Sequence, residues 1–332
     1  MLAELDLHGL SLWVLSLIVL LAFGGIAKSA GWIIESASGL ARRLGISELI
    51  VGLTIVAAGT SAPEFGVTMF AAFEGHGSIS VGNIVGSNIF NLGFVLGAAA
   101  LFRAIPTSPP LFWRDGFVLL ASSLVLFGLV GIDLKLDHRD GTLLFAMLLL
   151  YLGWLFMNRK VAPGSQGKMT ALEAIDEASP GLARAAFQLG GGMILLGACS
   201  HLLVGAVVAG APRLGVSEWV IGVTVVAAGT SIPEFATALT GLAKGRYGIS
   251  AGSVIGSDIF NLLGVLGLAG MLHPVEVDVL ARASLGSLCA MVLVVLVFIR
   301  SGWRISRLEG LVLFVAGLTR WILDFAMHSG RI

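Results

Sequence analysis

A six-residue motif occurs twice in this chain, and each copy lies in an apolar stretch long enough to cross a bilayer. Residues 59–64 read Gly-Thr-Ser-Ala-Pro-Glu, and residues 229–234 read Gly-Thr-Ser-Ile-Pro-Glu. A carboxylate at membrane depth is costly and usually functional, and a proline just before it breaks the helix locally. Two such broken helices in matching halves of a chain predict a transport site near the middle of the membrane.

Composition also predicts a membrane protein, because 57% of the 332 residues are hydrophobic and only 12% are charged, against about 25% in soluble domains. The net charge is zero, so nothing indicates nucleic acid as a partner. Cys199 and Cys289 lie in apolar runs, where we expect buried free thiols rather than a disulfide. The first ten residues contain no Lys or Arg, so we expect a retained span there and not a signal peptide.

Ten apolar segments, each of about the 20 residues that a bilayer requires, predict an all-α polytopic membrane protein. They lie near residues 11–29, 46–73, 78–102, 112–131, 139–157, 185–210, 217–243, 248–272, 282–300 and 309–327. The polar stretch 158–184 is expected to be a solvated cytoplasmic loop, although its acidic cluster could instead form a regulatory cation site. Arg42 and Arg43 suggest a short amphipathic helix at the membrane surface after the first segment.

The two halves of the chain are internal repeats. Shifted by 170 positions, residues 46–97 align on residues 216–267 without a gap, and 26 of the 52 positions are identical. Equivalent positions are five spans apart, and because five is odd the halves cross the membrane in opposite directions. The predicted fold is therefore ten transmembrane helices in two inverted five-helix repeats, residues 1–157 and 185–332, which share a site at their interface.

The distribution of Lys and Arg predicts the orientation in the membrane. If both termini lie outside, 14 of the 20 Lys and Arg residues fall on the cytoplasmic side. The opposite orientation would leave six there, so we expect both termini outside.

The repeated motif places polar groups on one face of a helix. Ala57, Thr60, Ser61 and Glu64 fall at i, i+3, i+4 and i+7. Pro63 has no N–H and its ring clashes with the carbonyl four residues earlier, so the carbonyls of residues 57–60 are expected to leave the helix ladder and to need a partner such as a cation. The second copy repeats the arrangement with Ala227, Thr230, Ser231, Pro233 and Glu234.

The following span in each half carries a second polar face. Residues spaced by four line that face, namely Asn83, Ser87 and Asn91 in the first half and Ser253, Ser257 and Asn261 in the second. Asn88 and Asp258 point roughly 100° away from the serines. Asp258 could be a third site carboxylate, a proton-binding group or a paired structural residue.

These residues predict a site for hard cations, because they offer two carboxylates, hydroxyls and amides but no His or Cys. A flexible, oxygen-rich cage favours calcium over magnesium, while manganese and sodium also fit the ligand type. The two carboxylates carry about −2 and can neutralise one divalent or two monovalent ions, so calcium and sodium should exclude one another. An empty site should take up a proton, because two like charges would otherwise lie close together. No resident cofactor is expected.

The two motifs, each present twice, resemble the alpha repeats of sodium/calcium exchangers, within the cation/calcium exchanger superfamily, in a short prokaryotic-type form. The resemblance implies an antiporter in a prokaryotic inner membrane that moves sodium in against calcium out by alternating access. It implies no protein partner beyond the lipid bilayer. The ion ligands that it implies are Glu64, Glu234, Thr60, Thr230, Ser61, Ser231, Ser87, Ser257, Asn91, Asn261 and the carbonyls of Ala57 and Ala227.

Two departures and three other functions bear on this reading. Some relatives carry an aspartate where this chain has Asn261, and residues 158–184 are too short for the calcium-sensing domains of animal exchangers. An exchanger of calcium or another divalent cation for protons on the same fold would use Asp258 or a glutamate as the proton carrier. A channel fits matched broken helices less well than alternating access does. An intramembrane hydrolase would need a nucleophile–base pair, which the spans lack, so we expect no enzyme.

Overall fold

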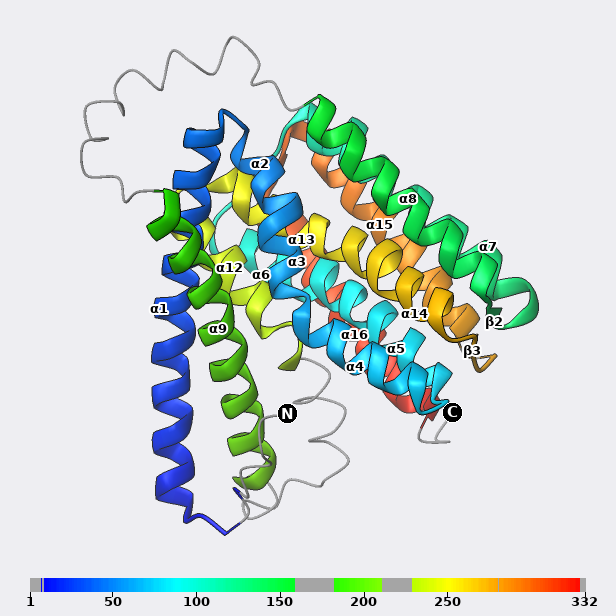
Figure 1. The fold of residues 1–332 in the computed structure, drawn as a ribbon, viewed down its shortest axis with the longest axis horizontal. Coiled ribbons are helices and arrows are strands. Elements are labelled where there is room, and N and C mark those ends of the chain that lie inside the picture. The colour runs from blue at the N-terminus through cyan, green and yellow to red at the C-terminus, as the bar shows by residue number, and fades with distance from the viewer. Residues whose placement is uncertain (1–6, 8, 159–181, 211–228, 280, 329–332) are drawn as a thin grey trace.

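The computed structural model describes residues 7, 9–158, 182–210, 229–279 and 281–328, nearly all of them in helices (Figure 1). Within these ranges, seven helices are long and apolar enough to cross a membrane, and the bent pair Glu48–Thr60 and Ala62–Phe73 is an eighth. Each of the ten predicted segments contains a described helix. The all-α polytopic fold predicted from the sequence is thus confirmed.

The first half contains π-helical turns (η) as well as α-helices. Its helices are α1 (Leu12–Leu44), α2 (Glu48–Val51), η1 (Gly52–Val56), α3 (Ala57–Thr60), α4 (Ala62–Phe73), α5 (Gly77–Phe90), η2 (Asn91–Val95), α6 (Leu96–Phe102), η3 (Leu111–Gly116), α7 (Phe117–Asp133) and α8 (His138–Met157).

The second half repeats this order where the structure describes it, except that α15 is α-helical from its start, where the first half has η3. Its helices are α9 (Leu182–Gly210), α12 (Ile232–Ala243), α13 (Tyr247–Ile259), η8 (Phe260–Val265), α14 (Leu266–Leu272), α15 (Ala281–Gly302) and α16 (Arg307–His328).

The first helix is longer than its apolar run. α1 spans 33 residues and ends at Gly45, whose φ of 63° is a left-handed conformation that favours glycine. Arg42 and Arg43 lie in its last turn, where positive charge suits the helix dipole, so the separate surface helix expected there is wrong. α1 packs along α9 at one edge of the molecule, beside the tilted bundle of the other helices (Figure 1).

Among the described residues, four two-residue strands lie at the ends of the bundle. β1 (Ile105–Pro106) pairs antiparallel with β4 (Arg304–Ile305), and β2 (Lys135–Leu136) pairs antiparallel with β3 (Val275–Glu276). By the shift of 170 positions, β3 is the counterpart of β1 and β4 is the counterpart of β2. Each strand therefore pairs with a strand of the other half, as an approximate two-fold axis between the repeats requires. The hydrogen bond from Lys135 across the second pair lowers the pKa of Glu276.

The repeats run in opposite directions. The helix of residues 77–102 starts beside the β2–β3 pair, where Ser78 Oγ accepts a hydrogen bond from the backbone N–H of Asp278, and ends just before β1. Its counterpart, residues 247–272, starts where Arg103 lies over the ring of Tyr247 and ends where His138 contacts the carbonyl of Met271. The inverted topology predicted from the odd number of spans is confirmed.

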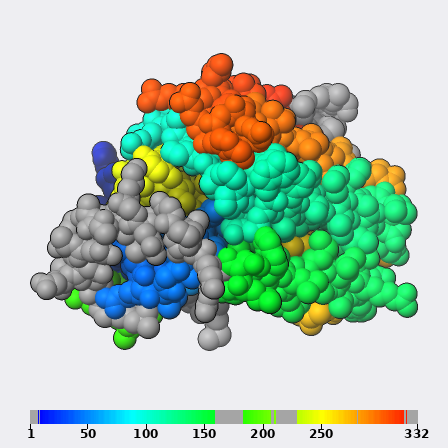
Figure 2. Space-filling view, turned by 90° about the horizontal axis from the view of Figure 1, so that it is seen from above, coloured from blue at the N-terminus to red at the C-terminus, as the bar shows by residue number. Residues whose placement is uncertain are grey.

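Basic residues collect at one end of the molecule, called here the arginine-rich end: Arg42, Arg43, Arg103, Arg246 and Arg304. There Arg246 and Glu48 form an ion pair of 3.1 Å between the second repeat and the first. Figure 2 views this end, where the end of α1 and the start of α2 (blue) and the end of α8 (green) reach the surface.

Candidate functional site

The first broken helix brings Glu64 into the protein interior. α3 ends at Thr60 and α4 begins at Ala62, and the axis of Glu48–Thr60 differs from that of α4 by 50°. Pro63 lies in the first turn of α4, where no helical hydrogen bond needs its N–H, and Glu64 lies in the same turn, where the helix dipole favours a carboxylate. Glu64 has no exposed surface.

The second half places a proline and a glutamate in the first turn of a helix in the same way. α12 begins at Ile232, with Pro233 and Glu234 in its first turn, and Glu234 is likewise fully buried. The residues that precede Gly229, including Ala227, lie outside the described part of the chain. The carbonyl of Ala227 therefore stays a sequence-based prediction.

One expectation about the break is wrong. The carbonyl of Ala57 is not freed from the helix, because it accepts hydrogen bonds from Ser61 N at 3.0 Å and from Thr60 Oγ1 at 3.2 Å. The bend begins only after Thr60, so the ladder is intact one turn before the proline. Both lone pairs of this oxygen are used within the chain.

The two glutamates are held by serines of the opposite repeat. Ser231 Oγ donates to Glu64 Oε1 at 3.2 Å, and Ser61 Oγ lies 3.5 Å from Glu234 Oε1. Ser257 Oγ also donates to Glu234 Oε1, at 2.7 Å, and its hydroxyl contacts that of Ser61. The interface between the repeats thus brings together both carboxylates and three of the predicted serines.

Asparagines form a second reciprocal layer. Asn91 Nδ2 donates to Asp258 Oδ1 at 3.0 Å, and its counterpart Asn261 Nδ2 donates to Asn88 Oδ1 at 3.1 Å. Asn88 Nδ2 in turn donates to the backbone carbonyl of Asp258 at 3.0 Å. Asn91 and Asn261 lie in the π-helical turns η2 and η8, a feature that occurs often at functional sites.

Three further polar residues of the first half lie on helices that carry the site, Thr60 on α3 and Asn83 and Ser87 on α5. Thr60 and Ser87 are buried, and Asn83 Nδ2 donates to the carbonyl of Glu64 at 3.3 Å and to Thr68 Oγ1 at 3.0 Å. Asn83 therefore supports the backbone of α4 next to the glutamate. Asn88 was not among the predicted ligands, although the shift of 170 positions aligns it with Asp258.

Each carboxylate of the interface keeps one oxygen without a hydrogen-bond partner, and so do Asn91 and Asn261. Among the described residues, the buried side-chain oxygens of this interface without a hydrogen-bond partner are Glu64 Oε2, Glu234 Oε2, Asp258 Oδ2, Asn91 Oδ1, Asn261 Oδ1 and Thr230 Oγ1. A buried acceptor without a partner costs about 1–3 kcal/mol, and several oxygen acceptors in one interior are what a cation would satisfy. The described residues include no group of three or more His, Cys, Asp or Glu side chains that could hold a metal, so a cation at this interface would also need hydroxyl and amide oxygens.

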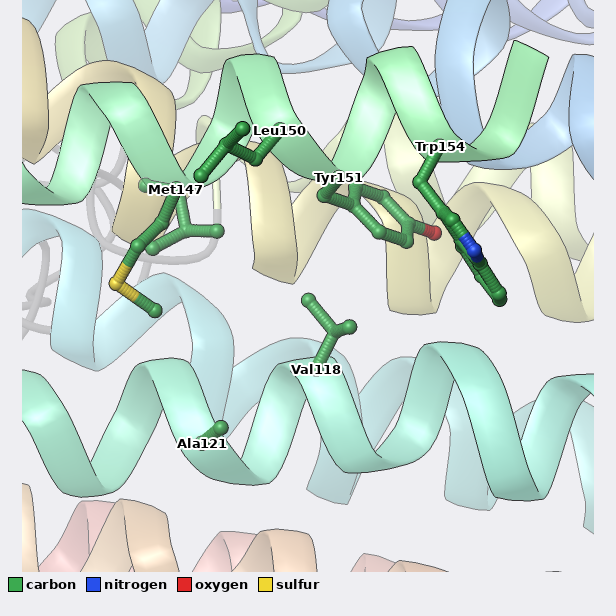
Figure 3. Close-up of a pocket in the computed structure, with 7 residues that line it drawn as sticks. Val118, Ala121, Met147, Leu150, Tyr151 and Trp154 are labelled. Carbon is green, nitrogen blue, oxygen red and sulfur yellow. The ribbon is translucent and has the colours of Figure 1, made fainter. Parts of the chain in front are cut away.

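A pocket between α7 and α8 lacks the open oxygen acceptors of the repeat interface. Figure 3 shows the pocket, of about 290 Å³, between Val118 and Ala121 of α7 and Met147, Leu150, Tyr151 and Trp154 of α8. Its one hydroxyl, on Tyr151, donates to Asp115 Oδ1 at 3.0 Å, and Arg114 pairs with the same carboxylate at 2.6 Å. The charge of Asp115 is thus compensated locally, and the pocket has no open acidic oxygen among its lining residues.

Comparisons with known proteins agree over nearly the whole chain. A family model described as "Sodium/calcium exchanger protein" matches residues 14–157 and 184–316. The inner membrane protein YrbG of Escherichia coli is 34% identical over 302 residues, which are 90% of this chain and 92% of YrbG. The sodium/calcium exchanger MaX1 of Methanosarcina acetivorans is 32% identical over 346 residues, with 90% and 95% covered.

The fold also matches solved structures. One of them, the sodium-calcium exchanger NCX_Mj soaked with 2.5 mM Na+ and 0.1 mM Ca2+, superposes with a TM-score of 0.80. The two chains are 26% identical, and the match covers 96% of this chain and 99% of the other.

Proposed function

Because the chain belongs to the sodium/calcium exchanger protein family, we propose that it exchanges sodium for calcium by alternating access, with the ions held between Glu64 and Glu234. It is an integral membrane protein of a transporter family. The observation that carries the ion site is the pair of buried glutamates at the repeat interface, each with one oxygen bonded to a serine of the other repeat and one oxygen open.

Charge and ligand type favour calcium and sodium as the cargo. Calcium takes about six to eight oxygen ligands in a flexible shell, and two carboxylates neutralise its charge. Sodium is also a hard cation and needs only part of that charge. The further ligands that we propose are Thr60, Thr230, Ser61, Ser231, Ser87, Ser257, Asn91 and Asn261.

The described conformation is closed around the carboxylates. Glu64 and Glu234 have no exposed surface, so an ion reaches them only after helices move. Because the repeats are inverted, the same movement in either repeat opens the site toward opposite sides of the membrane. This supports an exchanger more than a continuously open pore.

The arrangement in the cell follows from the sequence and remains part of the proposal. We propose two five-helix repeats, residues 1–157 and 185–332, joined by a cytoplasmic loop at 158–184, with both termini outside a prokaryotic inner membrane. The arginine-rich end then faces the cytoplasm, as the positive-inside rule expects. The partners are calcium, sodium and the bilayer lipids.

The experiment that tests the ion site is calcium-45 uptake into proteoliposomes loaded with sodium. Glu64→Gln and Glu234→Gln should each abolish uptake, because the neutral amide is nearly isosteric but removes half of the fixed charge of the two glutamates. Glu74→Gln is a matched control, since Glu74 caps the far end of the same helix α4 and is exposed. Melting temperature and gel-filtration profile check that the variants are folded.

Two outcomes would contradict the proposal. Normal uptake by either glutamine variant would rule out the site, and uptake driven by a pH gradient without sodium would show proton coupling instead. Vesicles loaded with lithium or potassium complete the comparison of driving ions.

A further inference from the structure

The second layer of the interface departs from the two-fold symmetry of the repeats at one position. Asn91 and Asn261 are equivalent, and so are Asn88 and Asp258, but the last two differ by a carboxylate in place of an amide. Asp258 has no exposed surface. Asp258 has no ion-pair partner among the described residues. The layer therefore carries one buried carboxyl group, on one side only.

The hydrogen bonds fix which atoms each pair leaves open. Asn91 uses its NH₂ group on Asp258 Oδ1, so Asn91 Oδ1 and Asp258 Oδ2 both stay without a partner among the described residues. In the equivalent pair, Asn261 donates to Asn88 Oδ1, and the NH₂ group of Asn88 donates to the backbone of Asp258. That pair leaves only Asn261 Oδ1 open. A carboxylate–amide pair thus presents two oxygens and a charge, whereas an amide–amide pair presents one neutral oxygen.

A buried carboxylate that stays ionised without an ion-pair partner needs a compensating cation, because burying a lone charge costs several kcal/mol. One negative charge matches a monovalent ion, while a divalent ion would need a second carboxylate and more oxygens. The pair lies next to the glutamates, since Ser257, the neighbour of Asp258 in α13, donates to Glu234 Oε1. On the basis of the proposed function, we propose that Asp258 and Asn91 act as one carboxylate–amide pair that binds a sodium ion beside the Glu64–Glu234 site.

The test is the displacement of calcium by sodium, measured by isothermal titration on the purified full-length protein. In Asp258→Asn, residues 91 and 258 both carry amides. When one NH₂ group donates to the other amide, the second NH₂ group takes the place of an open oxygen, whichever way the two amides turn. The sodium concentration for half-displacement should rise at least tenfold, and the Hill coefficient for sodium should fall by about one. Calcium affinity without sodium should change less than threefold, because both glutamates remain.

An exchange of the two side chains separates this role from a structural one. The double variant Asn91→Asp with Asp258→Asn reverses the pair but restores one hydrogen bond, one charge and two open oxygens, so the sodium response should return to within threefold of the parent protein. It also provides a measurement if Asp258→Asn alone does not fold. An unchanged sodium response in Asp258→Asn, or a folded double variant with no recovery, would overturn the proposal.

Glu64→Gln, measured in parallel, distinguishes a failure of the Asp258–Asn91 proposal from a failure of the proposed Glu64–Glu234 site. If Glu64→Gln loses calcium binding while Asp258→Asn keeps its sodium response, only the carboxylate–amide pair is refuted. If Glu64→Gln binds calcium normally, the proposed function itself is refuted.

Discussion

The approach of α13 to η1 should control the geometry of the proposed ion site. Gly248, Gly252 and Gly256 recur every four residues along α13, and the backbone of α2 and η1 lies against this face. A Cβ atom at Gly256 would lie 2.5 Å from Leu53 Cα and 2.6 Å from Leu53 O. These neighbours are backbone atoms, so no side-chain rotation can relieve the contact.

The size of the effect of Gly256→Ala follows from these distances. Carbon atoms in contact prefer about 3.5–4.0 Å, so α13 and η1 must separate by about 1 Å. Overpacking of this kind costs about 1–3 kcal/mol of stability. Ser257, the next residue, would move away from Glu234, with which it now forms a 2.7 Å hydrogen bond. A hydrogen bond to a charged group contributes about 1.5–3 kcal/mol, so calcium affinity should fall about tenfold or more.

The assay combines isothermal titration of calcium with thermal unfolding in detergent. Gly128→Ala is the control, because Gly128 lies on an exposed part of α7 with no described atom within 4 Å of its Cβ position. That variant should bind calcium as the parent does. If Gly256→Ala and Gly128→Ala had the same calcium affinity and melting temperature, close packing of α13 on η1 would not control the site.

The remaining predictions also concern the ion site. Ser257→Ala should weaken calcium binding more than Ser61→Ala does, because Ser257 Oγ lies 2.7 Å from Glu234 Oε1 and Ser61 Oγ lies 3.5 Å from it. Titration calorimetry measures the calcium affinity of both variants, and an equal loss of affinity in the two would contradict this ranking. Added sodium should lower the apparent calcium affinity with a dependence on sodium concentration steeper than first order, since more than one sodium ion is needed to replace a divalent charge. If saturating sodium left calcium affinity unchanged, the two ions would not share a site.

The fold followed from the sequence wherever the apolar runs were uninterrupted. The apolar run predicts a first helix that is too short, because the charged residues Lys28 and Glu35 interrupt the apolar pattern after about residue 29. In the structure these charges lie on the helix surface, where Lys28 stacks over Trp32 and Glu35 pairs with Lys244 of the second repeat. The partner of Glu35 lies 209 positions further along the chain and cannot be read from local hydropathy. The strand pairs were missed because two residues carry too little pattern to predict a strand.

For the candidate site, the sequence identified residues that meet at the repeat interface but not the hydrogen-bond partners of each. The shift of 170 positions identified Glu64, Glu234 and their serines, because equivalent residues meet at an inverted interface. The partners of Asn91 and Asn261 could not be assigned from regular helical spacing. Both residues lie in π-helical turns, which add residues to a turn and rotate the side chains relative to an α-helix.

The pairing of strands between the two halves of the chain also sets an order for biosynthesis. β1 and β2 leave the ribosome early, but their partners, β4 and β3, come from the last part of the chain. The first half is therefore inserted before its ends can be completed, and it cannot complete them by itself. Since β3 precedes β4 in the chain, the β2–β3 end can close first, and the arginine-rich end closes only when the last helix is being made. A ribosome that stops before Arg304 would release a protein with one end of the bundle left open.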